Sequence, residues 1–339
     1  MTEHYLQSPA TQALAMAELA RAALPKWNVS TAVVTLLKLR ENAVFRVDVP
    51  GGRSYVMRIH RHNYHSDAEL HSELQWLTAL ANAGFEAPQN VAAASGRPFE
   101  IVGIEAVPEP RQVDLLAWMN GRPMGAFWSS SSDELATLTG NFRLLGELAA
   151  RLHNQATTWR LPAGFTRHAW DAEGIVGESP FWGRFWELDA LMPDHRQLLA
   201  AARARVHRDL LRLGKNAATY SMIHADLVPE NVLVDGDAIR LIDFDDSGFG
   251  WHQFEIATAL ISHLGRPYFD SVRDALVEGY RRHRRLPDAA LEQLPLFFLA
   301  RSLTYLSWAH TRYETELAQQ LTPSFVETSC SLAEAYLSS

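Results

Sequence analysis

The segment from Ile223 to Asp246 combines residue types that suit phosphoryl transfer. It reads Ile-His-Ala-Asp-Leu-Val-Pro-Glu-Asn-Val-Leu-Val-Asp-Gly-Asp-Ala-Ile-Arg-Leu-Ile-Asp-Phe-Asp-Asp. Asp226 is a carboxylate that can accept the proton of a hydroxyl group. Asn231 and Asp243 offer an amide oxygen and a carboxylate, which are the hard ligands that Mg²⁺ takes together with substrate phosphates. The segment therefore predicts metal-assisted transfer of a phosphoryl group.

A predicted hairpin explains how the two metal ligands can meet. Val232 to Val234 and Ala238 to Ile242 are apolar runs of β-favouring residues, separated by Asp235-Gly236-Asp237. An Asp-Gly pair between two such runs is a strong hairpin signal. Folding about this turn brings Asn231 and Asp243 to the same end of two strands. The alternative interpretation is an ordinary surface hairpin with acidic residues at its ends.

The spacing of these residues resembles the aminoglycoside phosphotransferase and choline kinase superfamily, the small-molecule relatives of protein kinases. The signature of that superfamily is His-Gly-Asp-x-x-x-x-Asn, then a hydrophobic strand and Ile-Asp-Phe/Trp-Asp/Glu, and this chain departs from it at Ala225. The resemblance implies that Asp226 is the catalytic base and that His224 braces the loop. It also implies that Asn231 and Asp243 hold Mg²⁺.

Further acidic residues around the hairpin are assigned by the same resemblance. Either Asp245 or Asp246 is expected to touch the metal ion or the substrate while the other caps the following turn, and Asp245 is placed among the metal ligands. Phe254-Glu255-Ile256-Ala257 matches the family's Tyr-Asp-Leu-Ala element. Glu255 stands where an Asp usually buttresses the catalytic loop, and this replacement is expected to loosen the loop slightly.

A second kinase-like tetrapeptide, His207-Arg208-Asp209-Leu210, lacks the context of a catalytic loop. The residue five positions after Asp209 is Gly214 instead of Asn. Apolar residues recur at helical spacing through this stretch, which predicts an amphipathic helix with no hairpin behind it. Asp209 is therefore not expected to be catalytic. The apolar residues are Leu198, Leu199, Ala202, Val206, Leu210 and Leu213.

Length and composition fit a globular enzyme. The chain has 339 residues, 47% hydrophobic and 21% charged, with a formal net charge of -8. This charge argues against general binding to nucleic acid or to an anionic membrane, and it is compatible with a cationic substrate. Cys330 is the only cysteine, which excludes an internal disulfide and favours a reducing compartment. The first residues do not form a signal peptide, and no stretch reaches the roughly 18 apolar residues of a membrane-spanning helix. A cytoplasmic protein is expected, with its oligomeric state open.

The pattern along the chain, together with the resemblance, predicts an α+β, two-lobed, protein-kinase-like fold. A small N-terminal lobe, residues 1–118, has an antiparallel sheet and one helix beside the leading helix. A larger and mainly helical C-terminal lobe spans residues 119–339, with the hinge at about 115–122. The predicted helices are Thr11 to Ala23, Ser66 to Ala83, Asn141 to Asn154 and Leu291 to Trp308, and the predicted strands are Ala32 to Leu39, Ala43 to Val49, Ser54 to His60, Phe99 to Val107 and Val113 to Trp118.

An acidic residue falls on the apolar stripe of the helix that begins near Ser66. Ser66 and Glu69 form a capping box, and Glu73 lies within the stripe formed by the leucines of this helix. A buried acid needs a partner, and Arg58 is the candidate. The pair resembles the ion pair that positions ATP phosphates in kinases, with Arg58 where most kinases have Lys. A salt bridge internal to the lobe, or separate partners, is the alternative.

The remaining nucleotide contacts are predicted from the resemblance. No Gly-rich loop joins the first two strands, and the turn there contains Glu41 and Asn42, whose backbone N–H groups can serve instead. A plain polar turn is the alternative. In the resembled family the adenine lies against the connector between the lobes. That connector corresponds here to Leu116 to Met119 and includes Trp118, although this stretch could also be a simple turn.

The predicted reaction is transfer of the γ-phosphoryl group of Mg-ATP to a hydroxyl group of a small molecule. An amino alcohol, a sugar or an aminoglycoside-like compound is expected, and the turn at Leu39 to Phe45 looks closest to homoserine-kinase-like and stress-response-kinase-like members. A Ser/Thr protein kinase of the bacterial stress-response type is the alternative, although no Ala-Pro-Glu activation segment is recognisable. A non-catalytic nucleotide-binding module is disfavoured because the base and both metal ligands are present. The aromatic run Phe181 to Trp186 could bind an ammonium group, but core packing is favoured.

Overall fold

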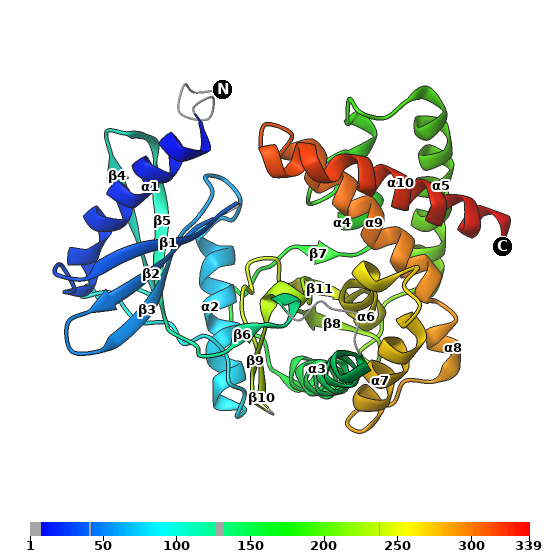
Figure 1. Cartoon of the computed structure of the whole chain (residues 1–339), viewed down its shortest axis with the longest axis horizontal. Helices are drawn as coiled ribbons and strands as arrows, with labels where there is room; N and C mark the ends of the chain where they lie inside the picture. Colours follow the sequence, from blue (N-terminus) through cyan, green and yellow to red (C-terminus); the bar gives the residue numbers. More distant parts are fainter. Residues whose placement is uncertain (1–7, 41, 127–131, 237) are drawn as a thin grey trace. The chain divides into compact units, whose positions relative to one another are not determined.

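The chain divides into two compact units. The structure is a computed structural model that describes residues 8–40, 42–126, 132–236 and 238–339. One unit contains Met1–Asn120 and Leu161–Thr166, and the other contains Gly121–Arg160 and Arg167–Ser339 (Figure 1). The expected boundary after Trp118 and this division differ by two residues, and a short later segment returns to the first unit.

The first unit is built on an antiparallel sheet of five strands in the order β1-β2-β3-β5-β4. Its strands are β1 (Val33–Leu39), β2 (Ala43–Val49), β3 (Arg53–Ile59), β4 (Phe99–Ile104) and β5 (Val107–Ala117). Helix α1 (Pro9–Ala23) packs its apolar face on this sheet, and Leu19 and Ala20 are fully buried there with Phe45 and Val47 of β2. The strand predicted from Val113 begins at Val107, because β5 also pairs with β4 along that earlier stretch.

Helix α2 (Asp67–Asn82) begins at the predicted capping box. The Ser66 hydroxyl accepts a hydrogen bond from the Glu69 backbone N–H at 3.3 Å, and Glu69 accepts one from the Ser66 N–H at 2.9 Å. These bonds satisfy donors that the first helical turn leaves open. Gly84 follows the last turn with φ 84°, a left-handed conformation that glycine adopts without strain.

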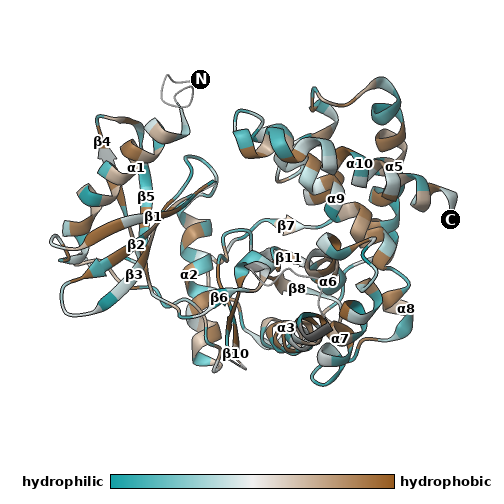
Figure 2. Cartoon of the chain, in the orientation of Figure 1, coloured by the Kyte–Doolittle hydropathy of each residue, from teal (hydrophilic) through white to brown (hydrophobic). Residues whose placement is uncertain are grey.

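The second unit is mainly helical, as predicted. Its helices are α3 (Ser132–Thr158), α4 (Ala172–Val176), α5 (Pro193–Leu213), α6 (His252–Leu260), α7 (Phe269–Arg281), α8 (Asp288–Leu291), α9 (Leu294–Thr311) and α10 (Glu316–Ser338). Hydrophobic and hydrophilic residues alternate along most of them (Figure 2). All residues of α6 and most of α9 are buried, so these two helices form the centre of the unit. None of the helices in the described ranges combines the length and the apolar character that a membrane span requires.

Two small sheets complete the second unit and carry the segment singled out from the sequence. One sheet has the order β10-β9-β6, and the other has the order β7-β11-β8. Their strands are β6 (Arg122–Pro123), β7 (Ala169–Trp170), β8 (Tyr220–Ile223), β9 (Val232–Asp235), β10 (Ala238–Leu241) and β11 (Gly248–Trp251). The stretch between β8 and β11 therefore runs from one sheet to the other and back.

The second kinase-like tetrapeptide lies inside α5, as its helical spacing predicts. Asp209 accepts a hydrogen bond from Arg205 Nε at 2.6 Å, one helical turn away. It also accepts one from the Tyr336 hydroxyl of α10 at 2.9 Å. The bond from Tyr336 joins α5 to α10 and the bond from Arg205 lies within α5, so both contacts of Asp209 are structural.

Candidate active site

The predicted hairpin forms and brings the two expected metal ligands together. Strands β9 and β10 are antiparallel, with Val232 opposite Leu241. One step further, the Ile242 N–H donates to the Asn231 carbonyl at 3.0 Å. Asn231 and Asp243 therefore lie at the same end of the hairpin, as predicted. Asp237 of the turn lies outside the described residues.

The backbone of the loop after β8 is hydrogen-bonded to a buried carboxylate. Glu255 of α6 accepts hydrogen bonds from the backbone N–H groups of His224, at 2.9 Å, and Ala225, at 2.6 Å. Burial raises the pKa of Glu255, although these bonds and the neighbouring His224 and Arg301 work in the opposite direction. Both of its oxygens accept a backbone hydrogen bond, so the slight loosening expected from Glu in place of Asp is not seen in these contacts.

His224 connects the loop to the hairpin. Its Nε2 lies 3.0 Å from the Ile242 carbonyl oxygen, and its Nδ1 accepts a hydrogen bond from the Asp226 N–H at 3.3 Å. A neutral imidazole with its proton on Nε2 satisfies both contacts. The ring is fully buried. His224 therefore fixes the backbone on both sides of the site, which agrees with the bracing expected of it.

Both oxygens of the Asp226 carboxylate are engaged. Oδ2 accepts a hydrogen bond from Asn231 Nδ2 at 2.7 Å, and the same nitrogen donates to the Asp226 carbonyl at 3.0 Å. Oδ1 accepts a hydrogen bond from Arg301 Nη2 at 2.7 Å. The carboxylate is 21% exposed, so it is oriented by the protein and still reachable from solvent.

The donor set at the end of the hairpin fits a hard divalent cation. Pro229 opens a turn of 3-10 helix, Pro229–Asn231, that turns Asn231 back toward Asp226. The amide nitrogen of Asn231 is committed to Asp226, which leaves the amide oxygen as the atom suited to a metal ion. Asp243 is partly exposed and has a left-handed φ of 64°. A non-glycine residue in this conformation is strained, and such strain is concentrated at functional sites.

The chain after the hairpin is anchored through its backbone. Asp245 is buried, and its carbonyl accepts a hydrogen bond from the guanidinium of Arg167. The Asp246 carbonyl accepts one from Trp170 Nε1 at 2.8 Å, and its Oδ1 accepts one from Trp182 Nε1 at 3.3 Å. These contacts fix both acidic residues in place beside the hairpin.

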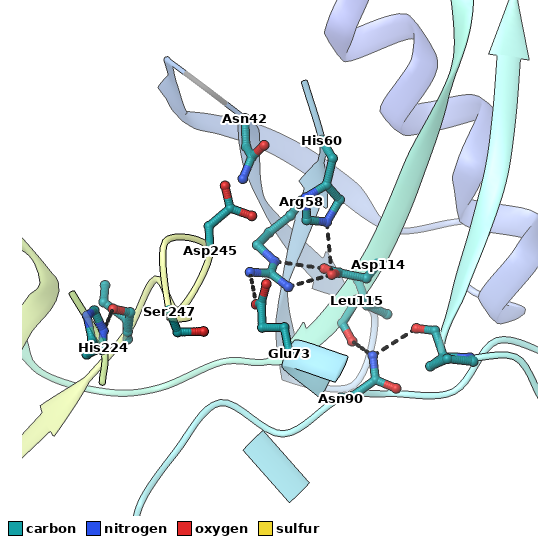
Figure 3. Close-up of polar contacts among 12 residues, drawn as sticks. Asn42, Arg58, His60, Glu73, Asn90, Asp114, Leu115, His224, Asp245 and Ser247 are labelled. Carbon is teal, nitrogen blue, oxygen red and sulfur yellow. Dashed lines mark hydrogen bonds and ion pairs between the residues drawn. The ribbon is translucent and has the colours of Figure 1, made fainter. Parts of the chain in front are cut away.

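In the first unit, Arg58 and Glu73 form the expected ion pair, and Asp114 of β5 joins it. Arg58 Nη1 lies 2.7 Å from Glu73 Oε1, while Nε and Nη2 donate to the two oxygens of Asp114 at 3.0 and 2.6 Å (Figure 3). His60 Nε2 lies 3.0 Å from the same carboxylate. Burial alone would raise the pKa of Asp114, but Arg58 and His60 outweigh it and lower this pKa to about 2. All four side chains are buried, so the cluster lies in the interior of the first unit.

The residues of the first turn and of the connector have contacts within their own unit. Glu41 lies outside the described residues. Asn42 is buried, and its Oδ1 accepts a hydrogen bond from the Arg61 N–H at 3.1 Å. Leu116 is buried and pairs with Val56 of β3. The Asn42 contact stabilises the turn, which favours a structural use of this side chain.

The end of β5 leads into a partly exposed stretch. The Trp118 N–H donates to the Ser54 carbonyl at 3.3 Å, and the Arg46 guanidinium lies 4.6 Å from the centre of the Trp118 ring. Met119 follows outside the strand and is partly exposed. The Trp118 N–H therefore already has a backbone acceptor within its unit, whereas Met119 lies beyond the last residue of β5.

The aromatic run Phe181 to Trp186 belongs mainly to the core. Trp182 and Phe185 are buried. The ring faces that could attract an ammonium group already have guanidinium neighbours, Arg203 at 3.8 Å from the Trp186 centre and Arg301 at 5.0 Å from the Trp182 centre. Core packing, the favoured interpretation of this run, agrees with these contacts.

Comparison with known proteins defines the class of this chain. It belongs to the phosphotransferase enzyme family, whose sequence profile matches residues 33–292. This confirms the resemblance seen in the sequence, and it makes the protein a phosphotransferase with the two-lobed α+β fold of that family.

Individual relatives are small-molecule kinases. The structure of a microcompartment-associated aminopropanol kinase is 34% identical with a TM-score of 0.82, and the match covers 95% of this chain and 97% of that one. An amicoumacin kinase solved with AMP-PNP, Ca²⁺ and Ami has the same fold, at 20% identity, a TM-score of 0.75 and 93% coverage of both chains. The amicoumacin kinase of Bacillus subtilis is 24% identical over 303 residues, which is 86% of this chain and 84% of the relative.

Replacing Ala225 with Gly is expected to stabilise the protein. Ala225 is buried and has φ 65°, which costs an L-residue about 1–2 kcal/mol, while glycine in the unfolded chain loses about 0.5–1 kcal/mol more entropy on folding. The difference predicts a gain of about 0.5–1 kcal/mol in the free energy of unfolding, measured by urea denaturation. Ala225→Val serves as the opposite variant, because a β-branched residue in this conformation should destabilise the protein.

Acid is expected to destabilise the second unit through two buried histidines near the loop after β8. The rings of His153 and His252 stack at 4.0 Å, and burial lowers the pKa of both well below the usual range. The unfolded chain takes up protons below about pH 6.5 that the folded chain does not, so stability falls as the pH falls below that value. The neighbouring charged and titratable groups are Glu255, Tyr280 and Arg284.

The size of this effect can be measured by urea denaturation between pH 8 and pH 5. Each histidine is expected to contribute a slope of up to about 1.4 kcal/mol per pH unit. The raised pKa of Glu255 acts in the opposite sense and reduces the net slope at the acid end. His252→Gln should flatten the dependence, and an unchanged slope in that variant would contradict the assignment.

Proposed function

We propose that the protein transfers the γ-phosphoryl group of Mg-ATP to a hydroxyl group of a small amino alcohol. The observation that carries this proposal is the Asp226 carboxylate, which is oriented by Asn231 at the same end of the hairpin as Asp243. A base beside two metal ligands is the arrangement that phosphoryl transfer requires. The likeness to an aminopropanol kinase, at 34% identity over nearly the whole chain, supports an amino alcohol as acceptor.

The reaction proposed for this site is a direct in-line transfer. Asp226 accepts a hydrogen bond from the acceptor hydroxyl and takes its proton as the new bond from oxygen to the γ-phosphorus forms. The bond from that phosphorus to the β,γ-bridging oxygen breaks, and ADP leaves. The protein contributes mainly by orienting the two reactants, which is the larger part of catalysis in phosphoryl transfer.

Magnesium is the cation proposed for the hairpin end. Asn231 and Asp243 would hold it, with Asp245 as a further candidate, and the oxygen donors present there fit its preference. Bound Mg²⁺ neutralises charge on the phosphates of the nucleotide. His224 and Glu255 have no direct part in this chemistry, since they hold the loop that presents Asp226.

The nucleotide contacts of the first unit form part of the same proposal. Met119 and Trp118 are assigned to the adenine together with Leu116, and the turn containing Glu41 and Asn42 is assigned to the phosphates. Arg58 is assigned to phosphate orientation, and Glu73, which pairs with its guanidinium, supports it. Its burial and pairing favour the structural role as its principal one.

The proposed function can be tested by measuring ADP release from Mg-ATP with a panel of acceptors. The panel contains amino alcohols such as 1-amino-2-propanol and ethanolamine, their deaminated analogues, simple sugars, an aminoglycoside and a generic protein substrate. Stimulation by an amino alcohol but not by its deaminated analogue is the expected result. Phosphorylation of protein Ser or Thr alone would move the assignment to a protein kinase. ATP binding without turnover on any acceptor would contradict the proposal.

Replacing Asp243 with Asn is expected to abolish metal-dependent turnover at ordinary Mg²⁺ concentrations. The substitution removes the negative charge that Asp243 would offer to the ion beside Asn231, so the apparent metal affinity should fall by about 10–100-fold, the size of loss that even supporting residues of metal sites cause. A titration of turnover with Mg²⁺ measures this effect. Asp235→Asn, at the exposed turn of the same hairpin, is the matched control and should titrate like the wild type.

A further inference from the structure

We propose that Arg301 is a positioning residue that fixes the orientation of the Asp226 carboxylate for proton acceptance. Arg301 lies on α9, far from the hairpin segment in sequence. This inference rests on the proposed function, because it assumes that Asp226 is the base. It adds a residue that the motif around Asp226 does not contain.

The contact between Arg301 and Asp226 is a short hydrogen bond from a fully buried side chain to a partly exposed one. Arg301 Nη2 lies 2.7 Å from Asp226 Oδ1, and the Arg301 side chain is fully buried whereas the carboxylate is partly exposed. Within the described part of the chain, Nε and Nη1 of Arg301 have no hydrogen-bond partner. A buried guanidinium normally satisfies most of its donors. Arg301 directs Nη2 at the functional carboxylate, and the hydroxyl of Tyr305 is a second polar group beside the guanidinium.

Aromatic rings hold the guanidinium where polar partners do not. The centres of the rings of Tyr305, Trp182 and Phe254 lie 4.5, 5.0 and 5.6 Å from the Arg301 Cζ atom. Cations are attracted to ring faces at such distances. Tyr305 in turn stacks on Phe325 of α10, with ring centres 5.1 Å apart. The position of Arg301 is therefore set by the packing of α9 and α10.

The geometry gives Asp226 two fixed points. Asn231 Nδ2 donates to Oδ2 and Arg301 Nη2 donates to Oδ1, so the plane of the carboxylate is defined by bonds from opposite partners. Without Arg301 the side chain would be held at one oxygen and free to rotate. Misplacement of a catalytic group by about 1 Å can reduce turnover by about 10²-fold.

A positioning role predicts a separation of kinetic parameters. Arg301→Met places an apolar side chain of similar length among the rings and removes the hydrogen bond to Asp226. We expect kcat to fall by about 10–100-fold while the KM for ATP stays within about 2-fold of the wild-type value. In Arg301→Ala, added methylguanidine should restore part of kcat. Arg203→Met is the control, because Arg203 covers the Trp186 ring and hydrogen-bonds to Val176 without contacting Asp226.

Thermal unfolding tests the contact without using activity. Asp226→Ala leaves the buried Arg301 charge without its carboxylate, so we expect a lower Tm than for the wild type. Combining it with Arg301→Met should recover part of the loss, since the uncompensated charge is then gone. Additive losses in the double variant would contradict the coupling.

The outcomes separate this inference from the proposed function. An active wild type with an equally active Arg301→Met variant would overturn the role of Arg301 and leave the proposed function intact. Equal losses in kcat and in ATP affinity without rescue by methylguanidine would assign Arg301 to stability alone. A wild type that is silent on every acceptor would overturn both proposals, whatever the thermal cycle shows.

Discussion

Replacing Asp226 with Asn is expected to lower kcat by about 10²–10⁴-fold, the contribution typical of a positioned general base. Asn has almost the same shape and can keep the contact with Arg301, but it cannot take up the hydroxyl proton. The affinity for ATP should remain close to the wild-type value, because Asp226 is assigned to the acceptor. Steady-state kinetics with the stimulating acceptor, together with calorimetric ATP binding, measures both quantities.

The chain supplies its own control for this substitution. Asp209 stands in the kinase-like tetrapeptide of α5, where it is bonded to Arg205 and Tyr336. Asp209→Asn, made in the same background and assayed in the same way, should leave kcat unchanged. Near-normal turnover of Asp226→Asn, or a severe loss in Asp209→Asn, would refute the choice of base.

Replacing Arg58 with Met is expected to lower the free energy of unfolding by about 3–5 kcal/mol, the usual cost of removing one partner of a buried ion pair. Arg58 neutralises two carboxylates, Asp114 and Glu73, which are fully buried. Its loss would leave both carboxylates in the interior without their guanidinium partner. Urea denaturation measures the change. Arg53→Met, at an exposed position of the same strand, should change the free energy by no more than about 0.5 kcal/mol.

The same variant separates the two roles assigned to Arg58. A structural role predicts a large loss of stability whether or not nucleotide is present, and a smaller loss in Arg58→Lys, which keeps the charge but cannot reproduce the paired bonds to Asp114. An unchanged free energy of unfolding combined with a severe loss of ATP affinity would contradict the structural account and identify Arg58 chiefly as a phosphate ligand.

Local signals in the sequence predicted the parts of the site that depend on neighbouring residues. The Asp-Gly turn set the hairpin and thus the meeting of Asn231 with the segment at Asp243. The capping box set the start of α2, and helical periodicity showed that Asp209 lies in a helix. Each of these features is decided within a few residues, so tertiary packing had little opportunity to override it.

Contacts between distant segments were not predictable in the same way. Arg301 and Asp226 are separated by 75 positions, and Arg58 and Asp114 by 56. A weak signal existed for both missed residues, since Arg301 interrupts the apolar run of α9 and Asp114 interrupts the apolar strand Val113 to Leu116. A charge at such a position predicts a buried partner. It does not say which of the many opposite charges the fold will supply.

The structure also revises the effects expected of two residues that belong to the recognised motifs. The replacement of Asp by Glu255 was expected to loosen the loop slightly, yet the fold uses its two oxygens for two backbone N–H groups. Ala225 stands where the family signature has glycine, and its left-handed φ makes it a strained position. Backbone conformation and bond partners, which no local pattern specifies, decide such cases.

The most direct test of the central claim is to identify the product of the reaction. Wild-type protein and Asp226→Asn are incubated with Mg-ATP and the stimulating amino alcohol, and phosphorus NMR with mass spectrometry follows the fate of the γ-phosphoryl group. We predict a phosphomonoester on the acceptor hydroxyl, formed in equal amount to ADP by the wild type and nearly absent with Asp226→Asn. Release of inorganic phosphate without any acceptor ester, or equal ester formation by both proteins, would contradict the account.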